Sequence, residues 1–466
     1  MGTKLLERIW RSVAEQGRAL ARLPHSFDAE ANAVALAHAL LSQNGEATGA
    51  ARAVALVDAY LALEDEQRRR FHTYLAHEFQ PEPERLKTAA LAYHASPTAG
   101  MAAALNAASE SPRQELLRRM NVAPGATKVL VRMREELLTA GRGGSEPDSL
   151  EQDLRHLLTS WFNRGFLELR RIDWNTSAAI LEKLIAYEAV HEIRGWDDLR
   201  RRLAPDRRCF AFFHPALPGE PLIFVEVALC RGLAEEIAPL LSLAETGNDV
   251  DRADTAIFYS ISNCQPGLRG IAFGSFLIKQ VVEALRGELP QLKCFATLSP
   301  VPGFRPWLDR RLSERDESFL RAEERAQITG AGDSAAAGLS SLLAKKDWNE
   351  DSPADEPLKT ILLHLCARYL TAANEGRGPN DPVARFHLGN GARLERIRWR
   401  ANVSARGLEE SYGLMVNYRY DPDTIEANHE KFAARGAVAM SSQVSGLLGE
   451  ASWRIRGLSL VRSFGL

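Results

Sequence analysis

The chain has no strong excess of either charge, few cysteines and no long apolar run. Its 58 basic and 60 acidic residues give a formal net charge of −2, which offers no reason to expect a nucleic-acid partner. The five cysteines are widely spaced and form no CxxC pair. This pattern speaks against a zinc site or a disulfide framework and favours a reducing compartment. No apolar run approaches the ~20 residues that span a bilayer, so no membrane partner is expected.

Targeting signals are also missing from the two ends of the sequence. The N-terminal segment is amphipathic, carries acidic residues and lacks a signal-peptide core. The last residues, Ser463-Phe464-Gly465-Leu466, do not form the peroxisomal tripeptide. We therefore expect a cytoplasmic protein.

The composition changes along the chain and indicates two parts. A length of 466 residues is too long for one compact core. Residues 1–190 are rich in Ala, Leu, Glu and Arg, with apolar residues at three- and four-residue spacing, which predicts a series of helices. Near Arg207 the pattern changes to β-rich runs separated by turn residues and mixed with helical stretches. Residues 191–466 are therefore predicted to be α+β.

The most informative segment runs from Ala256 to Phe304. It contains an apolar run, a loop rich in glycine, an amphipathic run and a second apolar run that ends at Ser299-Pro300. The free N–H groups and the dipole of a helix N-terminus favour an anionic phosphate. Small residues also occur before helices for packing reasons alone. The order suggests a nucleotide-tailed substrate whose reacting end lies near Ser299.

Three further positions could carry chemistry beside Ser299. Two prolines follow this serine and fix its backbone, and a serine becomes a nucleophile when a base is within hydrogen-bond reach. Among eleven histidines, His387 stands in a stretch rich in Gly and Asn that is predicted to be a loop, where catalytic groups are often mounted. Tyr418 and Tyr420 could donate hydrogen bonds to a carboxylate or an enolate. A turn serine, a packed histidine and packed tyrosines are the structural alternatives.

Several segments together resemble the malonyl-CoA decarboxylase family, in the same order and over about residues 155–425. These segments are RRIDWNTSAAILEKLIAYEAVHEI, FHPALPGEPLIFVEVAL, FYSISNCQPGLRGIAFGSFLIKQVV, LSPVPGF, FHLGNGARLERIRW and YGLMVNYRY. The helical N-terminal part is similar by pattern. An ordered set of segments is far more specific than a single Gly-rich loop.

The resemblance implies a fold, a substrate and an assembly. The fold would be an N-terminal all-helical bundle domain (1–190), used for oligomerisation, followed by a C-terminal GCN5-type N-acetyltransferase-like (GNAT) mixed α/β domain (191–466). The substrate would be malonyl-CoA and the assembly a homotetramer. Neither a metal nor a cofactor is implied, because CoA is part of the substrate.

The family's functional residues carry over onto specific positions. Its catalytic serine, histidine and tyrosine correspond to Ser299, His387 and Tyr420. Its CoA pyrophosphate loop corresponds to Gly267, Arg269, Gly270, Ile271, Ala272, Gly274 and Ser275. Gly267 stands where such loops commonly have Gln or Arg. Ala272 stands where animal members have a glutamate, which suggests that this glutamate is not essential to the chemistry.

The implied reaction is a cofactor-free decarboxylation through an enolate, which would make the chain a carboxy-lyase. In one mechanism, Ser299 and His387 grip the carboxylate, and one of them delivers a proton to the α-carbon directly or through water. In the other, Ser299 is a nucleophile that forms a malonyl-enzyme, with His387 as its base. Two other classes remain open at this point: an N-acyltransferase on the same fold, and a non-catalytic CoA-sensing or scaffolding protein.

Overall fold

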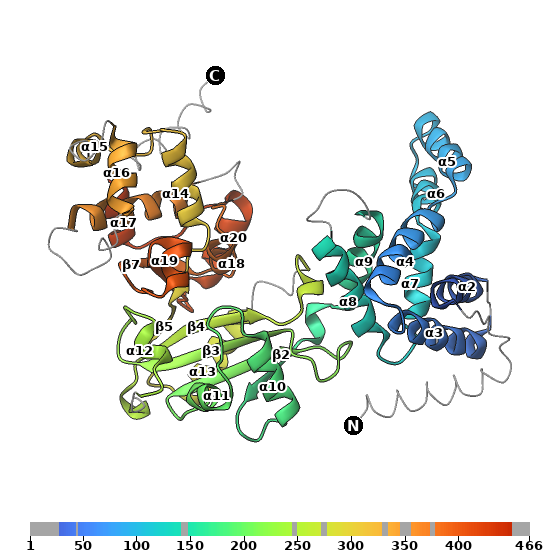
Figure 1. The fold of residues 1–466 in the computed structure, drawn as a ribbon, viewed down its shortest axis with the longest axis horizontal. Coiled ribbons are helices and arrows are strands. Elements are labelled where there is room, and N and C mark those ends of the chain that lie inside the picture. The colour runs from blue at the N-terminus through green and yellow to red at the C-terminus, as the bar shows by residue number, and fades with distance from the viewer. Residues whose placement is uncertain are drawn as a thin grey trace. The chain divides into compact units, whose positions relative to one another are not determined.

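The computed structural model describes most of the chain, and tertiary contacts divide it into two units (Figure 1). The described residues are 28–42, 45–140, 148–244, 249–271, 277–328, 334–344, 356–372 and 378–449. The first unit contains the described residues up to Glu168 together with 212–222 and 263–271, and the second contains the others. None of the helices in these ranges is long and apolar enough to cross a membrane.

Helices make up most of the first unit. They are α2 (Ala29–Leu41), α3 (Glu46–Leu61), α4 (Asp65–Glu78), α5 (Pro83–Ala95), α6 (Ala99–Ser109), α7 (Pro112–Met120), α8 (Ala126–Ala140) and α9 (Asp148–Trp161). Local signals start several of them. The Asp28 carboxylate caps α2 by accepting the N–H of Glu30 at 2.9 Å, and Pro83 and Pro112 occupy first-turn positions. Buried side chains such as Leu56 then pack the helices together.

The second unit contains a sheet and the helices around it. The strands that lie wholly or mostly in this unit are β1 (Glu168–Ile172), β2 (Arg207–Phe213), β3 (Ile223–Cys230), β4 (Thr255–Asn263), β5 (Cys294–Thr297), β6 (Ser299–Pro300), β7 (Arg393–Arg398) and β8 (Met415–Arg419). Its helices are α10 (Ala178–Tyr187), α11 (Trp196–Arg202), α12 (Ala238–Leu241), α13 (Leu277–Glu288), α14 (Phe304–Ser313), α15 (Ala322–Ile328), α16 (Ala335–Leu343), α17 (Glu356–Thr371), α18 (Pro382–Gly389), α19 (Ala405–Ser411), α20 (Ile425–Arg435) and α21 (Ser442–Leu448).

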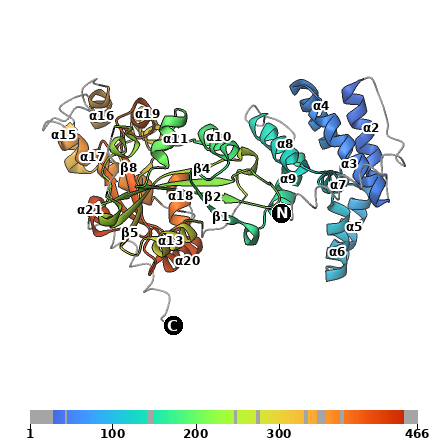
Figure 2. The same ribbon diagram turned by 90° about the horizontal axis from the view of Figure 1, so that it is seen from below.

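The described strands form one mixed sheet. Its order is β1-β2-β3-β4-β5-β8-β6, and β7 pairs with β8. In Figure 2, α10 and α11 lie on one side of the strands and α13 on the other. β2 and β3 are buried along their whole length, as expected for strands covered on both faces.

The pairing of β4, β5 and β8 in the sheet determines the position of Ser299. β4 and β5 are parallel, in a register that runs from Thr255 opposite Cys294 to Phe258 opposite Thr297. α13 connects them, as a parallel pair requires. β4 continues to Asn263, whereas β5 and the residues after it pair with β8, with Ala296 opposite Arg419 and Ser299 opposite Val416. Ser299 is therefore located where the two parallel strands part.

The predicted order of the fold is confirmed: a helical N-terminal part precedes a mixed sheet with helices. Two local predictions differ from the structure. β1 lies inside the range 1–190 that composition predicts as helical. The expected loop around His387 is the last turn of α18, because Asp381 and Pro382 provide a cap and a first-turn proline.

Candidate active site

Strand alternation brings Thr297 and Ser299 to one face of the sheet. Residues two apart in a strand point to the same side, and Ser299 lies opposite Val416 of β8. Both side chains are buried, with 0% of Thr297 and 6% of Ser299 exposed. The Ser299 hydroxyl donates to Thr297 Oγ1 at 2.9 Å. The direction of the serine side chain is therefore set by the strand and not by the turn that follows.

α18 delivers the histidine to the same place. The Asp381 carboxylate caps this helix by accepting the N–H groups of Val383 (3.0 Å) and Ala384 (2.9 Å). Its other oxygen accepts the N–H of Gly303 at 3.3 Å, in the turn after Ser299. Asp381 thus ties the start of the histidine helix to the serine turn. Burial raises the pKa of this carboxyl group.

Ser299, His387 and Tyr420 form one hydrogen-bonded group. The Oγ of Ser299 lies 2.9 Å from Nε2 of His387, and the Nδ1 of the same ring lies 2.7 Å from the hydroxyl of Tyr420. The imidazole stacks on the ring of Tyr418 at a centroid distance of 4.6 Å. Phe258 of β4 makes an edge contact with Tyr420 at 6.1 Å. The structure thus brings together the three side chains predicted as catalytic.

Burial determines the protonation of this group. It lowers the pKa of His387 to about 3, because a buried imidazolium loses its hydration. It also raises the pKa of Tyr420 well above its ordinary value. At neutral pH the group therefore consists of a neutral imidazole between two neutral hydroxyls. It can donate and accept hydrogen bonds without carrying charge of its own.

The predicted pyrophosphate loop is described only in part. Ala272, Gly274 and Ser275 lie outside the described residues. Arg269 and Gly270 are exposed, and Gly270 has a φ of +79° that favours glycine. Ile271 is buried.

Gly267 has a separate structural reason to be glycine. A Cβ there would lie 2.0 Å from the carbonyl oxygen of Val131 on α8. The Gly267 carbonyl also accepts a hydrogen bond from Arg134 at 2.6 Å. This position is therefore explained by packing against α8 within the first unit.

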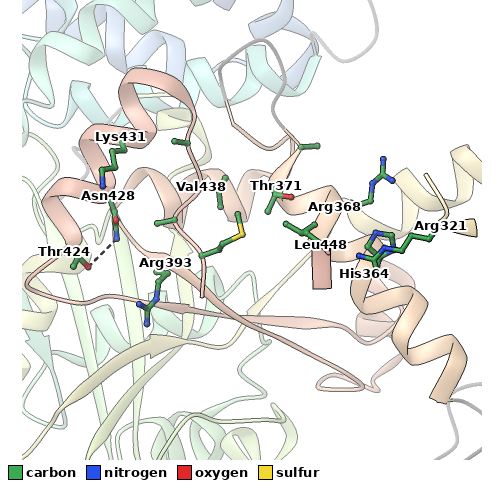
Figure 3. Close-up of a pocket in the computed structure, with 14 residues that line it drawn as sticks. Arg321, His364, Arg368, Thr371, Arg393, Thr424, Asn428, Lys431, Val438 and Leu448 are labelled. Atoms are coloured by element: carbon green, nitrogen blue, oxygen red, sulfur yellow. Dashed lines mark hydrogen bonds between the residues drawn. The ribbon is translucent and has the colours of Figure 1, made fainter. Parts of the chain in front are cut away.

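A separate cavity of about 910 Å³ opens among α17, α20, α21 and the start of β7 (Figure 3). Four basic side chains line it: Arg321, Arg368, Arg393 and Lys431. Figure 3 shows Arg321 and Arg368 at one end and Arg393 and Lys431 at the other, so the cations do not converge on one point. Its lining includes neither Ser299, His387 nor Tyr420.

Two features of the site were not predicted from the sequence. Thr297 contacts Ser299 directly, and the period-two pattern of the strand could have indicated it. Asp381 precedes a proline, which is a typical helix start. Among the residues that the structure describes, no group of three or more His, Cys, Asp and Glu side chains is placed to hold a metal ion.

The fold and the site define a mixed α/β domain in which a serine, a histidine and a tyrosine meet where β4 and β5 part. Comparison of the sequence with models of known protein families narrows this class to one family. The one described as Malonyl-CoA decarboxylase C-terminal domain matches residues 165–456, and the one described as Malonyl-CoA decarboxylase N-terminal domain matches residues 79–162. The chain belongs to the malonyl-CoA decarboxylase family.

Individual relatives agree with this assignment. A crystal structure of malonyl-CoA decarboxylase from Rhodopseudomonas palustris is 48% identical, covers 91% of this chain and 100% of that one, and has a TM-score of 0.82. The corresponding structure from Agrobacterium vitis is 48% identical, covers 90% and 100%, and has a TM-score of 0.80. The mitochondrial malonyl-CoA decarboxylase of Anser anser anser is 38% identical over 332 residues, which are 69% of this chain and 66% of the goose protein.

Proposed function

We propose that this chain is a carboxy-lyase that converts malonyl-CoA to acetyl-CoA and CO2. One observation carries the proposal: Ser299, His387 and Tyr420 meet within hydrogen-bond distance in a chain of the malonyl-CoA decarboxylase family. These residues are far apart in the sequence, and only the fold brings them together. Roles in fatty acid and malonate metabolism would follow from this reaction.

Decarboxylation of malonyl-CoA depends on the orientation of the substrate carboxylate more than on an added reagent. Loss of CO2 leaves a carbanion beside a thioester carbonyl, and the thioester delocalises that charge as an enolate. The protein must hold the carboxylate out of the thioester plane and stabilise the developing oxyanion. Backbone N–H groups near the point where β4 and β5 part would serve as that oxyanion hole. On this account no cofactor is required.

The neutral site suits the binding of a carboxylate. Ser299 and His387 would hold the malonyl carboxylate, and one of them would supply a proton to the α-carbon directly or through water. Tyr420 would hold the far side of the imidazole and shape the acyl end of the pocket. The competing mechanism keeps Ser299 as a nucleophile and His387 as its base. It predicts a covalent malonyl-enzyme that the first mechanism does not form.

The remaining parts of CoA would bind along the loop before α13. We assign the pyrophosphate to the loop formed by Gly267, Arg269, Gly270, Ile271, Ala272, Gly274 and Ser275. The exposed Arg269 and the left-handed Gly270 support this assignment, because a cation and an open backbone suit a diphosphate. Gly267 would contribute by fixing the base of the loop on α8.

We also propose a cytoplasmic homotetramer assembled through the helical domain. The five cysteines all lie in the described ranges and are not joined in disulfides, which fits a reducing compartment. Measuring the mass of the purified chain by light scattering tests the assembly. A tetramer that is lost when residues before 165 are removed would support it, and an unchanged tetramer would contradict the part given to the helical domain.

The activity is tested by supplying malonyl-CoA to the purified chain with no added metal, nucleotide or amine. The proposal predicts equal amounts of CO2 and acetyl-CoA. A parallel reaction with acetyl-CoA and a mixture of primary amines tests the N-acyltransferase alternative. Free CoA released only when amines are present, without CO2 from malonyl-CoA, would overturn the decarboxylase assignment.

A further inference from the structure

Thr297 joins the candidate catalytic group to the main chain of β8. It is the last residue of β5, and none of its surface is exposed. Its hydroxyl oxygen lies 2.9 Å from Ser299 Oγ, 3.1 Å from the backbone nitrogen of Tyr418 and 3.4 Å from the carbonyl oxygen of Val416. The Thr297 hydroxyl therefore has two main-chain partners and one side-chain partner.

The two main-chain partners determine what the threonine can do. A hydroxyl has one hydrogen and two lone pairs. The Tyr418 N–H can only donate, so it takes one lone pair of Thr297 Oγ1. The Val416 carbonyl can only accept, so it takes the hydrogen. One lone pair is left for Ser299, whose hydroxyl must then donate to Thr297.

The direction of the hydrogen bond from Ser299 to Thr297 determines which ring nitrogen of His387 carries the hydrogen. Because the Ser299 hydrogen points to Thr297, the contact between Ser299 Oγ and His387 Nε2 at 2.9 Å is a hydrogen bond only if Nε2 carries a hydrogen. In a neutral imidazole the other nitrogen is then unprotonated. The Tyr420 hydroxyl, 2.7 Å from Nδ1, must therefore donate to it. The hydrogen bonds that link Tyr420, His387, Ser299, Thr297 and Val416 then all have the same direction, because each group donates to the next one in this series.

We propose that Thr297 is a positioning residue that takes the hydroxyl hydrogen of Ser299 and thereby holds His387 in the tautomer with its hydrogen on Nε2. This inference deepens the proposed function and rests on it for its catalytic meaning. In this arrangement Nε2 has no lone pair to accept the Ser299 proton. The resting site therefore offers the Nε2 hydrogen to the substrate carboxylate and does not activate Ser299 as a nucleophile.

Kinetics of two variants at position 297 test the role of the hydroxyl. Thr297→Val keeps the shape of the side chain and removes the hydroxyl, so Ser299 loses its acceptor. We expect kcat to fall about tenfold, the value of one hydrogen bond, with KM within about twofold. Thr297→Ser restores the hydroxyl and should recover kcat to within about threefold. Thr255→Val is the matched control, because Thr255 is a buried threonine whose hydroxyl bonds to Asp254.

The tautomer provides a readout that does not depend on activity. Nitrogen NMR of the protein with ¹⁵N-labelled histidine separates protonated from unprotonated ring nitrogens, and His387→Gln identifies the signals of this ring. The wild type should show a protonated Nε2, and Thr297→Val should show a second population with the hydrogen on Nδ1. Thr297→Ser should resemble the wild type.

The outcomes separate this inference from the proposed function. A wild-type His387 protonated on Nδ1, or an unchanged tautomer in Thr297→Val, overturns the inference whatever the kinetics show. A changed tautomer with unchanged kcat overturns the positioning role. If the tautomer responds as expected but the wild type releases no CO2 from malonyl-CoA, the proposed function fails while the assignment of the hydrogen bonds stands.

Discussion

Ser299 and His387 are 88 positions apart in the chain, and their side chains meet at 2.9 Å. β6 carries the serine, and a helix capped by Asp381 carries the histidine. The same aspartate accepts the N–H of Gly303 in the turn after the serine. The Asp381 carboxylate therefore contacts both the helix that carries the histidine and the turn that follows the serine. This keeps the separation of the two candidate catalytic side chains fixed before substrate binds.

Replacing Ser299 by alanine should remove most of the decarboxylation. His387 would lose its hydrogen-bond partner, and the site would lose the hydroxyl group beside the substrate carboxylate, so we expect kcat to fall about 10²- to 10⁴-fold. Steady-state CO2 release measures this loss, with Ser260→Ala of β4 as a buried serine control outside the group. Activity close to the wild-type value would exclude both mechanisms. A covalent malonyl group trapped on Ser299 would exclude the carboxylate-holding one.

Replacing Tyr420 by phenylalanine should loosen the imidazole without removing it. The ring keeps its contact with Phe258, but Nδ1 loses its donor. We expect kcat to fall about tenfold, close to the value of one hydrogen bond, with a smaller change in KM. Tyr418→Phe is the matched comparison, since the Tyr418 hydroxyl is buried with no hydrogen-bond partner among the described residues. Equal kcat values for the two variants would contradict the role of Tyr420.

The buried histidine should make stability depend on pH in the acid range. The pKa of His387 is about 3 in the folded chain and ordinarily 6.5, so between these values only the unfolded chain binds the proton. The free energy of unfolding should therefore fall as pH drops below 6.5, by up to ~1.4 kcal/mol per pH unit from this group. Above pH 6.5 the group contributes no slope.

Urea denaturation between pH 7.5 and 5 measures this effect. Because other buried groups add their own slopes, the comparison is between the wild type and His387→Gln. We expect the variant to lose less stability on acidification than the wild type. Parallel curves for the two proteins would show that burial of His387 is not coupled to its protonation.

Replacing Gly267 by alanine should destabilise the first unit. The new Cβ would lie 2.0 Å from the Val131 carbonyl oxygen, a main-chain atom that can move only with α8. We expect a loss of about 1–3 kcal/mol in the free energy of unfolding. Gly49→Ala in α3 is the control, because no heavy atom lies within 4 Å of its Cβ position. An alanine at 267 that is tolerated as well as the one at 49 would contradict the packing explanation.

Much of the fold could be predicted from the sequence because its patterns are local. Apolar spacing indicates the helices of the first part, and the β-rich runs near Arg207 indicate β2 and β3. The length of the helical part was overestimated because β1 is short and rich in charged residues, with three of its five residues exposed. A strand of this kind lacks the alternation that identifies strands.

The candidate site residues can be proposed from the sequence, but their contacts cannot. The family resemblance points to Ser299, His387 and Tyr420, whereas their mutual hydrogen bonds depend on how β8 and α18 lie against β5. The period-two pattern of the strand places Thr297 beside Ser299, but its contacts with main-chain groups at 416 and 418 have no local signal in the sequence. Gly267 could not be separated from a phosphate-binding glycine, since its neighbour on α8 is more than a hundred residues away in the chain.

The most direct measurement compares the wild type with His387→Ala in CO2 release and acetyl-CoA formation from malonyl-CoA, without added metal, nucleotide or amine. The account predicts equal amounts of both products from the wild type and a loss of at least about 10²-fold in the variant. A variant as active as the wild type would contradict the central part given to His387. A folded wild type that binds CoA but releases no CO2 would contradict the decarboxylase assignment itself.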